Sequence, residues 1–87
     1  MKYIVTFSIK PENVDAAIVR FKETGGQPPA GVTLLGRWHE AGTGRGFTLV
    51  DSDDPVAMTK FSIVWADLLD QRITPVVDDA QLAAALP

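Results

Sequence analysis

The sequence predicts a small α+β domain whose strands and helices follow the order βαββαβ. Three observations predict it: a strand-like segment directly after Met1, two segments with apolar residues at helical spacing, and a glycine-rich turn between two further strand-like segments. The chain of 87 residues, 46% hydrophobic, has apolar surface for one core and not for two. It has no cysteine, which excludes disulfides, thiolate nucleophiles and cysteine metal sites.

The first strand is predicted over residues 3–9, because β-branched and aromatic residues dominate this segment and Lys10-Pro11 bounds it. The first helix is predicted from about residue 11 to residue 24, where apolar residues recur at i, i+3, i+4 and i+7. Gly25-Gly26 ends this helix, because glycine tolerates the left-handed conformation that follows a helix end. The stripe consists of Val14, Ala17, Ile18 and Phe21.

Residues 32–40 and 45–51 are predicted to pair as a hairpin around the turn formed by residues 41–44. The length of the loop sets the register of the two strands. An even loop places Trp38 opposite Phe47, whereas an odd loop would mix polar and apolar residues on each face. We therefore expect an even loop, which also pairs Gly36 with Leu49 and Leu35 with Val50.

The second helix is predicted to begin at Asp54-Pro55, because proline suits the first helical position and the residue before it favours the extended conformation of an N-cap. The last strand is predicted over residues 71–77, at a sheet edge, because Pro75 has no N–H for a ladder. We divide the chain into a domain over residues 1–78 and a C-terminal helical tail over residues 79–87. The buried stripe of the second helix is expected to contain Ala57, Phe61, Val64, Trp65 and Leu68.

This order of elements is typical of the ferredoxin-like fold, a four-stranded antiparallel sheet with strand order 4-1-3-2 and both helices on one face. We expect the helix-covered face to carry Val5, Phe7, Leu34, Trp38, Phe47 and Leu49. The other face would then be half apolar, with Ile4, Thr6, Ser8, Thr33, Leu35, Arg37, His39, Thr48 and Val50. Such a face is typical of a sheet that packs on a second sheet, so we expect a twofold homodimer.

The hairpin also holds the only histidine of the chain, His39, two residues from Arg37. Both side chains project from the same face of the strand, and the glycine opposite His39 leaves space beside the imidazole. We therefore name His39 and Arg37 as candidate catalytic residues, the imidazole as acid, base or donor and the guanidinium as holder of a carboxylate or oxyanion. The alternative is a pair of interface residues beside a bend, which a lone histidine without a fixed partner favours.

Four further residues are candidates for binding a ligand between sheet and helices: Tyr3, Trp38, Thr48 and Trp65. Core anchoring is the alternative interpretation of the two tryptophans. The acids of residues 51–54 are explained by helix capping rather than Mg²⁺ binding, and a single histidine provides no zinc cluster. We predict neither a metal nor a cofactor. The glycines of residues 42–46 lie between two strands and lack the spacing of a phosphate loop.

The charge of the chain argues against partners that need a basic surface. The net charge is -3 and the pI is about 4.8, so nucleic acid and anionic membranes are not expected partners. Residues 1–45 carry six bases and four acids, whereas residues 46–87 carry two bases and seven acids. No apolar run approaches the ~18 residues of a membrane span, and no signal-peptide pattern is present. A cytoplasmic location is therefore expected.

Several short motifs follow one another between residue 1 and about residue 80: Pro29-x-Gly31-Val32, Gly36-x-Trp38, Gly46-Phe47, Asp53-Asp54, Trp65-x-x-Leu68-x-Asp70 and Pro75-Val76. In this order and spacing they resemble the small bacterial family of domain of unknown function 3303. The resemblance implies a dimeric α+β barrel, in which two ferredoxin-like sheets close against one another. That wider group includes cofactor-free monooxygenases, haem-degrading enzymes, muconolactone-isomerase-like enzymes and ligand-binding proteins. Asp51 and Phe61 stand where members of the family often have Glu and Trp.

These observations favour a binding or interaction module, a dimeric barrel that holds a small, partly apolar molecule. The alternative is a cofactor-independent enzyme of the monooxygenase or isomerase kind that uses His39 and Arg37. A third interpretation gives the tail a role in assembly, with Leu82 and Leu86 docked on a partner. The position of His39 separates the first two, because an imidazole far from any cavity would exclude the enzyme.

Overall fold

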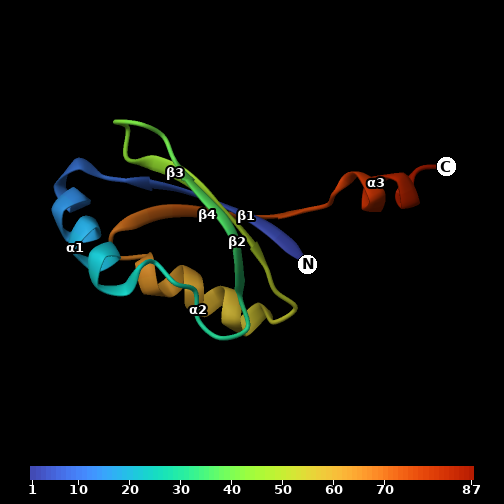
Figure 1. The fold of residues 1–87 in the computed structure, drawn as a ribbon, viewed down its shortest axis with the longest axis horizontal. Helices are drawn as coiled ribbons and strands as arrows, with labels where there is room; N and C mark the ends of the chain where they lie inside the picture. Colours follow the sequence, from blue (N-terminus) through green and yellow to red (C-terminus); the bar gives the residue numbers. More distant parts are fainter.

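The computed structural model describes residues 1–87 as a four-stranded antiparallel sheet with two helices on one side of it (Figure 1). The ferredoxin-like α+β fold predicted from the sequence is confirmed. The strands lie in the order β2-β3-β1-β4, so the proline-containing β4 is at a sheet edge. In chain order the elements are β1 (Lys2–Ile9), a 3-10 turn (Pro11–Asn13), α1 (Val14–Thr24), β2 (Thr33–His39), β3 (Arg45–Asp51), α2 (Pro55–Trp65), β4 (Leu69–Val76) and α3 (Asp79–Ala85).

The boundaries of α1 and α2 follow from local chemistry. Gly25 ends α1 in the left-handed conformation with φ of 67°, and its N–H donates to the Phe21 carbonyl. Asp54 caps α2, because its carboxylate accepts from the N–H groups of Val56 at 2.9 Å and Ala57 at 3.3 Å. The sequence signals for both helix ends are therefore confirmed.

The hairpin register is as predicted near the turn and differs farther from it. Trp38 pairs with Phe47, but Leu34, not Leu35, pairs with Val50, because a β-bulge interrupts β2 between Leu34 and Gly36. The bulge adds one residue to β2, so Leu34 packs against the core and Leu35 stays exposed. The sequence shows no sign of this insertion, since the apolar pair Leu34-Leu35 fits either register.

The sheet face on which most hairpin side chains lie is opposite to the one that we predicted. Pairing with β1 places Thr48 opposite Val5 and Phe47 opposite Thr6, so Thr48 lies on the helix side and Phe47 on the open side. Burial agrees, because Thr48 is 3% exposed and Phe47 is 42% exposed. The correction moves Trp38, Phe47 and Leu49 to the open side, and Arg37, His39, Thr48 and Val50 to the helix side. The physical reason is that β3 carries apolar residues on both of its faces, so the sequence pattern alone does not decide which face is buried. The pairing of β3 with β1 decides it.

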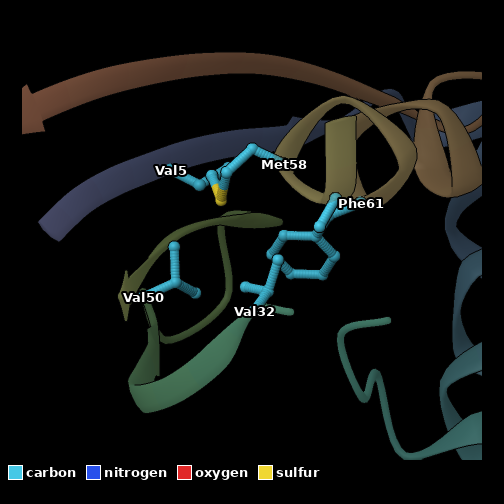
Figure 2. Packing of buried hydrophobic residues seen from close by; sticks show 6 residues of the cluster. Val5, Val32, Val50, Met58 and Phe61 are labelled. Atoms are coloured by element: carbon cyan, nitrogen blue, oxygen red, sulfur yellow. The ribbon is translucent and has the colours of Figure 1, made fainter. Parts of the chain in front are cut away.

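The main core lies between α2 and the sheet. Figure 2 shows the Met58 and Phe61 side chains pointing from α2 toward Val5, Val32 and Val50. A second cluster consists of Ala17, Trp65 and Leu68, where the two helices meet. Val64, expected in the buried stripe of α2, is instead 54% exposed.

The C-terminal helix α3 extends away from the rest of the molecule (Figure 1) and buries none of its residues. A capping box between Asp78 and Gln81 begins it, and Lys2 forms an ion pair with Asp78 at 3.6 Å. Its apolar residues Leu82 and Leu86 are exposed. None of the helices combines the length and the apolar composition that a bilayer-crossing helix requires.

Candidate functional site

A cleft of about 280 Å³ lies on the helix side of the sheet. This volume is near the lower end of the range for small-molecule sites, roughly 300 to 1,000 Å³. All four strands and both α1 and α2 contribute to its walls, so it exists only in the folded domain. The lining residues are Val5, Phe7, Ile9, Ala17, Ile18, Phe21, Lys22, Gly26, Arg37, His39, Thr48, Phe61, Trp65, Leu69 and Gln71.

The cleft is open because α1 covers its part of the sheet incompletely. Only Ala17 of the predicted α1 stripe is buried, while Ile18 is 46% exposed and Phe21 is 41% exposed at the rim. By contrast, α2 packs Phe61 and Trp65 into the interior. A helix with a partly uncovered apolar face leaves apolar walls that a ligand can contact.

A solvent-exposed ion pair links α1 to the segment that follows α2. The Arg20 guanidinium donates to both carboxylate oxygens of Asp67 at 2.7 Å and to the Val64 carbonyl at 2.9 Å. It also lies 5.3 Å from the centre of the Trp65 ring. The hydrogen bonds from Arg20 lower the pKa of Asp67.

Arg37 supplies a cation to the cleft without a carboxylate partner. Its guanidinium donates to Thr48 Oγ1 at 3.4 Å, to the Gly25 carbonyl at 3.4 Å and to the Gly26 carbonyl. It lies 5.6 Å from the centre of the Phe21 ring. None of the salt bridges of the chain involves Arg37. Desolvation by burial lowers the pKa of Arg37, so a half-buried positive charge faces the cleft uncompensated.

Gly26 makes room for this arginine. Its φ is 62°, and a Cβ added there would lie 2.6 Å from Arg37 Nη1 and 2.9 Å from Phe21 Cε2. The preceding Gly25 has a similar φ of 67°, but the nearest side-chain atom to its added Cβ is 3.8 Å away. The two glycines therefore share the same backbone conformation and differ in what a side chain would displace.

Gly26→Ala is expected to destabilise the protein more than Gly25→Ala. Both changes force a left-handed alanine, which costs about 1–2 kcal/mol, and only the change at Gly26 also displaces Arg37. Urea denaturation of the two variants measures the difference, and the Nε–H signal of Arg37 in ¹⁵N spectra should shift in the Gly26 variant alone. Equal stability losses with an unmoved Arg37 signal would contradict this role of Gly26.

His39 lies at the rim of the cleft, exposed to solvent. Its ring meets Phe7 edge-on at 5.6 Å and Phe21 edge-on at 6.0 Å between centres. None of the side-chain hydrogen bonds within the cleft involves its imidazole. The space predicted opposite His39 is filled, because a Cβ on Gly46 would lie 2.6 Å from Phe7 Cζ.

The structure brings four of the six sequence-predicted site residues to the cleft and leaves two elsewhere. Arg37, His39, Thr48 and Trp65 line it. Trp38 lies on the open face of the sheet, and Tyr3 packs beside the main core cluster. Trp38 falls outside the cleft because its side chain lies on the opposite face of the sheet. Tyr3 falls outside because it precedes Val5, the first residue of β1 that lines the cleft.

Sequence reasoning missed several residues of the cleft, among them Phe7, Phe21, Lys22, Phe61 and Gln71. Gln71 donates its amide to the Ser62 carbonyl at 2.9 Å and so ties β4 to α2. The sequence signal for Gln71 is a polar residue on the buried face of a strand. This signal can be used only after the two faces of that strand have been assigned correctly. No group of three or more His, Asp or Glu side chains is placed to hold a metal ion.

The open face of the sheet carries the other aromatic pair. Trp38 is 51% exposed and stacks on Phe47 with ring centres 5.2 Å apart. The Trp38 ring covers Gly36, where an added Cβ would collide with the indole. Gly36 therefore lets the indole lie flat on the sheet instead of projecting into solvent.

The protein is a ferredoxin-like α+β domain, because it has a four-stranded antiparallel sheet with two helices on one side. An amphipathic cleft lies between these two layers. Within this class, the chain belongs to the family described as Domain of unknown function (DUF3303), whose model matches residues 1–87. The match includes the C-terminal helix. Comparison with curated proteins found no matching relative.

Proposed function

We propose that the protein binds a small, mainly apolar molecule in the cleft between the helices and the sheet. One observation supports this proposal above the others: the cleft has apolar walls and a few converging polar groups, the usual composition of small-molecule sites. The aromatic residues Phe7, Phe61 and Trp65 supply walls, and Arg37 and Thr48 supply polar contacts. The family description leaves the activity open.

A second candidate function is that of a cofactor-independent monooxygenase or isomerase. It is supported by His39 and Arg37, which line the same cleft from alternate positions of β2. We favour binding over catalysis, because an imidazole that acts as a base is normally oriented by a hydrogen bond from its second nitrogen. Here the ring is held only by the edges of Phe7 and Phe21.

Filling the mouth of the cleft is expected to weaken ligand binding. Ile18→Trp enlarges a half-exposed side chain that lines the cleft, whereas Val19→Trp makes a comparable change on the same helix outside it. Native mass spectrometry of freshly purified protein, alone and with a panel of small aromatic and aliphatic compounds, reports retained and added ligands. The Ile18 variant should bind at least about tenfold more weakly, the equivalent of ~1.4 kcal/mol of lost apolar contact.

The Val19 variant serves as the control and should bind as the wild type does. Equal binding by both variants would place the ligand elsewhere. A wild-type protein that neither retains nor binds any compound of the panel would refute the proposed function.

We also propose that two copies of the chain pair through the open face of the sheet. Trp38 and Phe47 are each more than two-fifths exposed there, at 51% and 42%, and Leu35 at the bulge of β2 is 46% exposed. Ile4 and Leu49 pair with each other on the same face and join this apolar surface across β1 and β3. Large exposed apolar surfaces of this kind mark protein interfaces, and a twofold dimer is the commonest assembly of small proteins. A cytoplasmic location stays a prediction.

A further inference from the structure

The polar groups of the cleft are unusual in their charge. Its lining includes Arg37, Lys22 and His39, and no aspartate or glutamate. The whole chain, by contrast, carries a net charge of -3. The cleft is therefore a locally cationic site in an acidic protein, and its field favours an anionic ligand.

Arg37 retains the capacity to bind a further acceptor. A guanidinium has five N–H donors, and one contact from each of its three nitrogens leaves two N–H groups without a protein acceptor. Its present acceptors are two carbonyls and a hydroxyl, which are uncharged. A carboxylate would form charge-assisted hydrogen bonds with these N–H groups, and it would neutralise a charge that burial disfavours.

The surroundings of Arg37 favour a carboxylate over a phosphate. The carbonyls of Gly25 and Gly26 point at the guanidinium, so they repel a doubly charged phosphate more strongly than a singly charged carboxylate. Phosphate sites in proteins present backbone N–H groups at a helix N-terminus or in a turn. The Arg37 guanidinium instead contacts backbone carbonyls directly after the C-terminal end of α1. The remaining walls are mostly hydrophobic.

We propose that the ligand is a small aromatic or short-chain aliphatic carboxylate, whose carboxylate pairs with Arg37 while its apolar part lies between Phe7, Phe61 and Trp65. This inference rests on the proposed function of the cleft and specifies its ligand class. The volume of about 280 Å³ restricts the ligand to a small molecule.

Matched pairs of acids and their primary amides test the charge requirement. We would titrate phenylalkanoic and alkanoic acids of about six to ten carbon atoms, and the corresponding amides, into the full-length protein by calorimetry. The wild type should bind each fitting acid about 10- to 100-fold more tightly than its amide, the range expected for hydrogen bonds to a charged group. Arg37→Gln should remove this preference, so that each acid binds about as weakly as its amide.

Lys22→Gln is the matched control, because Lys22 lies at the exposed rim and should contribute only a small, salt-dependent part of the preference. Equal affinities of the wild type for acid and amide would overturn the carboxylate assignment and leave the proposed binding function intact. Loss of amide binding by Arg37→Gln would also overturn it, since Arg37 would then only maintain the shape of the cleft. Binding of neither compound of any pair would refute the proposed function itself.

Discussion

Replacing Trp38 by aspartate should convert the proposed dimer into a monomer. Trp38 stacks on Phe47 on the exposed apolar face, and it contributes to neither buried cluster. In a sheet-to-sheet interface, the new carboxylate would be buried without a partner at a cost of about 3–5 kcal/mol, which weakens association by roughly two to four orders of magnitude. The monomer itself should stay folded, because the side chain that is lost is 51% exposed in one chain.

Light scattering after size-exclusion chromatography, over a range of protein concentrations, measures this change. Val64→Asp is the control: it introduces the same charge on α2, at a side chain that is 54% exposed on the helix side of the molecule. This variant should keep the wild-type mass. Removal of residues 79–87 tests separately whether the exposed Leu82 and Leu86 contribute to pairing. A wild type that is monomeric at micromolar concentration would refute the proposed dimer.

Phe61→Ala should cause a large loss of folding stability. The Phe61 side chain is 7% exposed and joins the main core cluster to the wall of the cleft (Figure 2). Truncation of a buried phenylalanine costs about 3–5 kcal/mol, and small domains have only about 5–15 kcal/mol in total. The variant should therefore be largely unfolded or close to it at room temperature.

Urea denaturation at one fixed protein concentration compares Phe61→Ala with Ile63→Ala, a truncation two residues away on the same helix. Ile63 is 66% exposed, so its loss should change the free energy of unfolding by no more than about 0.5 kcal/mol. Similar losses in both variants would show that Phe61 is not part of a well-packed core.

The fold was predictable from the sequence because its signals are local. The proline and aspartate at the start of α2, the paired glycines after α1 and the even hairpin loop each act within a few residues of where they stand. Pro75 similarly indicated that β4 lies at an edge. Such signals determine the order of the elements, and the ferredoxin-like topology follows from that order.

The orientation of the hairpin was not predictable in the same way. Both faces of β3 are apolar, with Phe47 and Leu49 on one side and Val50 on the other, so alternation does not distinguish core from interface. We placed the largest aromatic residue, Trp38, in the core, whereas the domain leaves it exposed. The bulge at Leu35 added a second error that no local pattern reveals.

The candidate site was predicted in part for this reason. Arg37 and His39 were recognised by residue type alone. The hairpin was assigned to the wrong face of the sheet, but these two residues share one face of β2 in either orientation. Their neighbours Phe21 and Gly26 come from α1 and the turn after it, which only the tertiary fold brings to β2. The role of Gly26 depends on a collision with Arg37 that the sequence does not show.

The two tryptophans report separately on the two sides of the sheet, since Trp65 lines the cleft and Trp38 lies on the open face. In the proposed functions, the two sides of the sheet have different roles, ligand binding on the helix side and pairing on the other. In ¹⁵N spectra, a carboxylic acid that binds should shift the indole N–H signal of Trp65 and leave that of Trp38 in place, whereas dilution should shift Trp38 and leave Trp65. A ligand that shifts Trp38 alone, or dilution that shifts neither signal, would contradict the account.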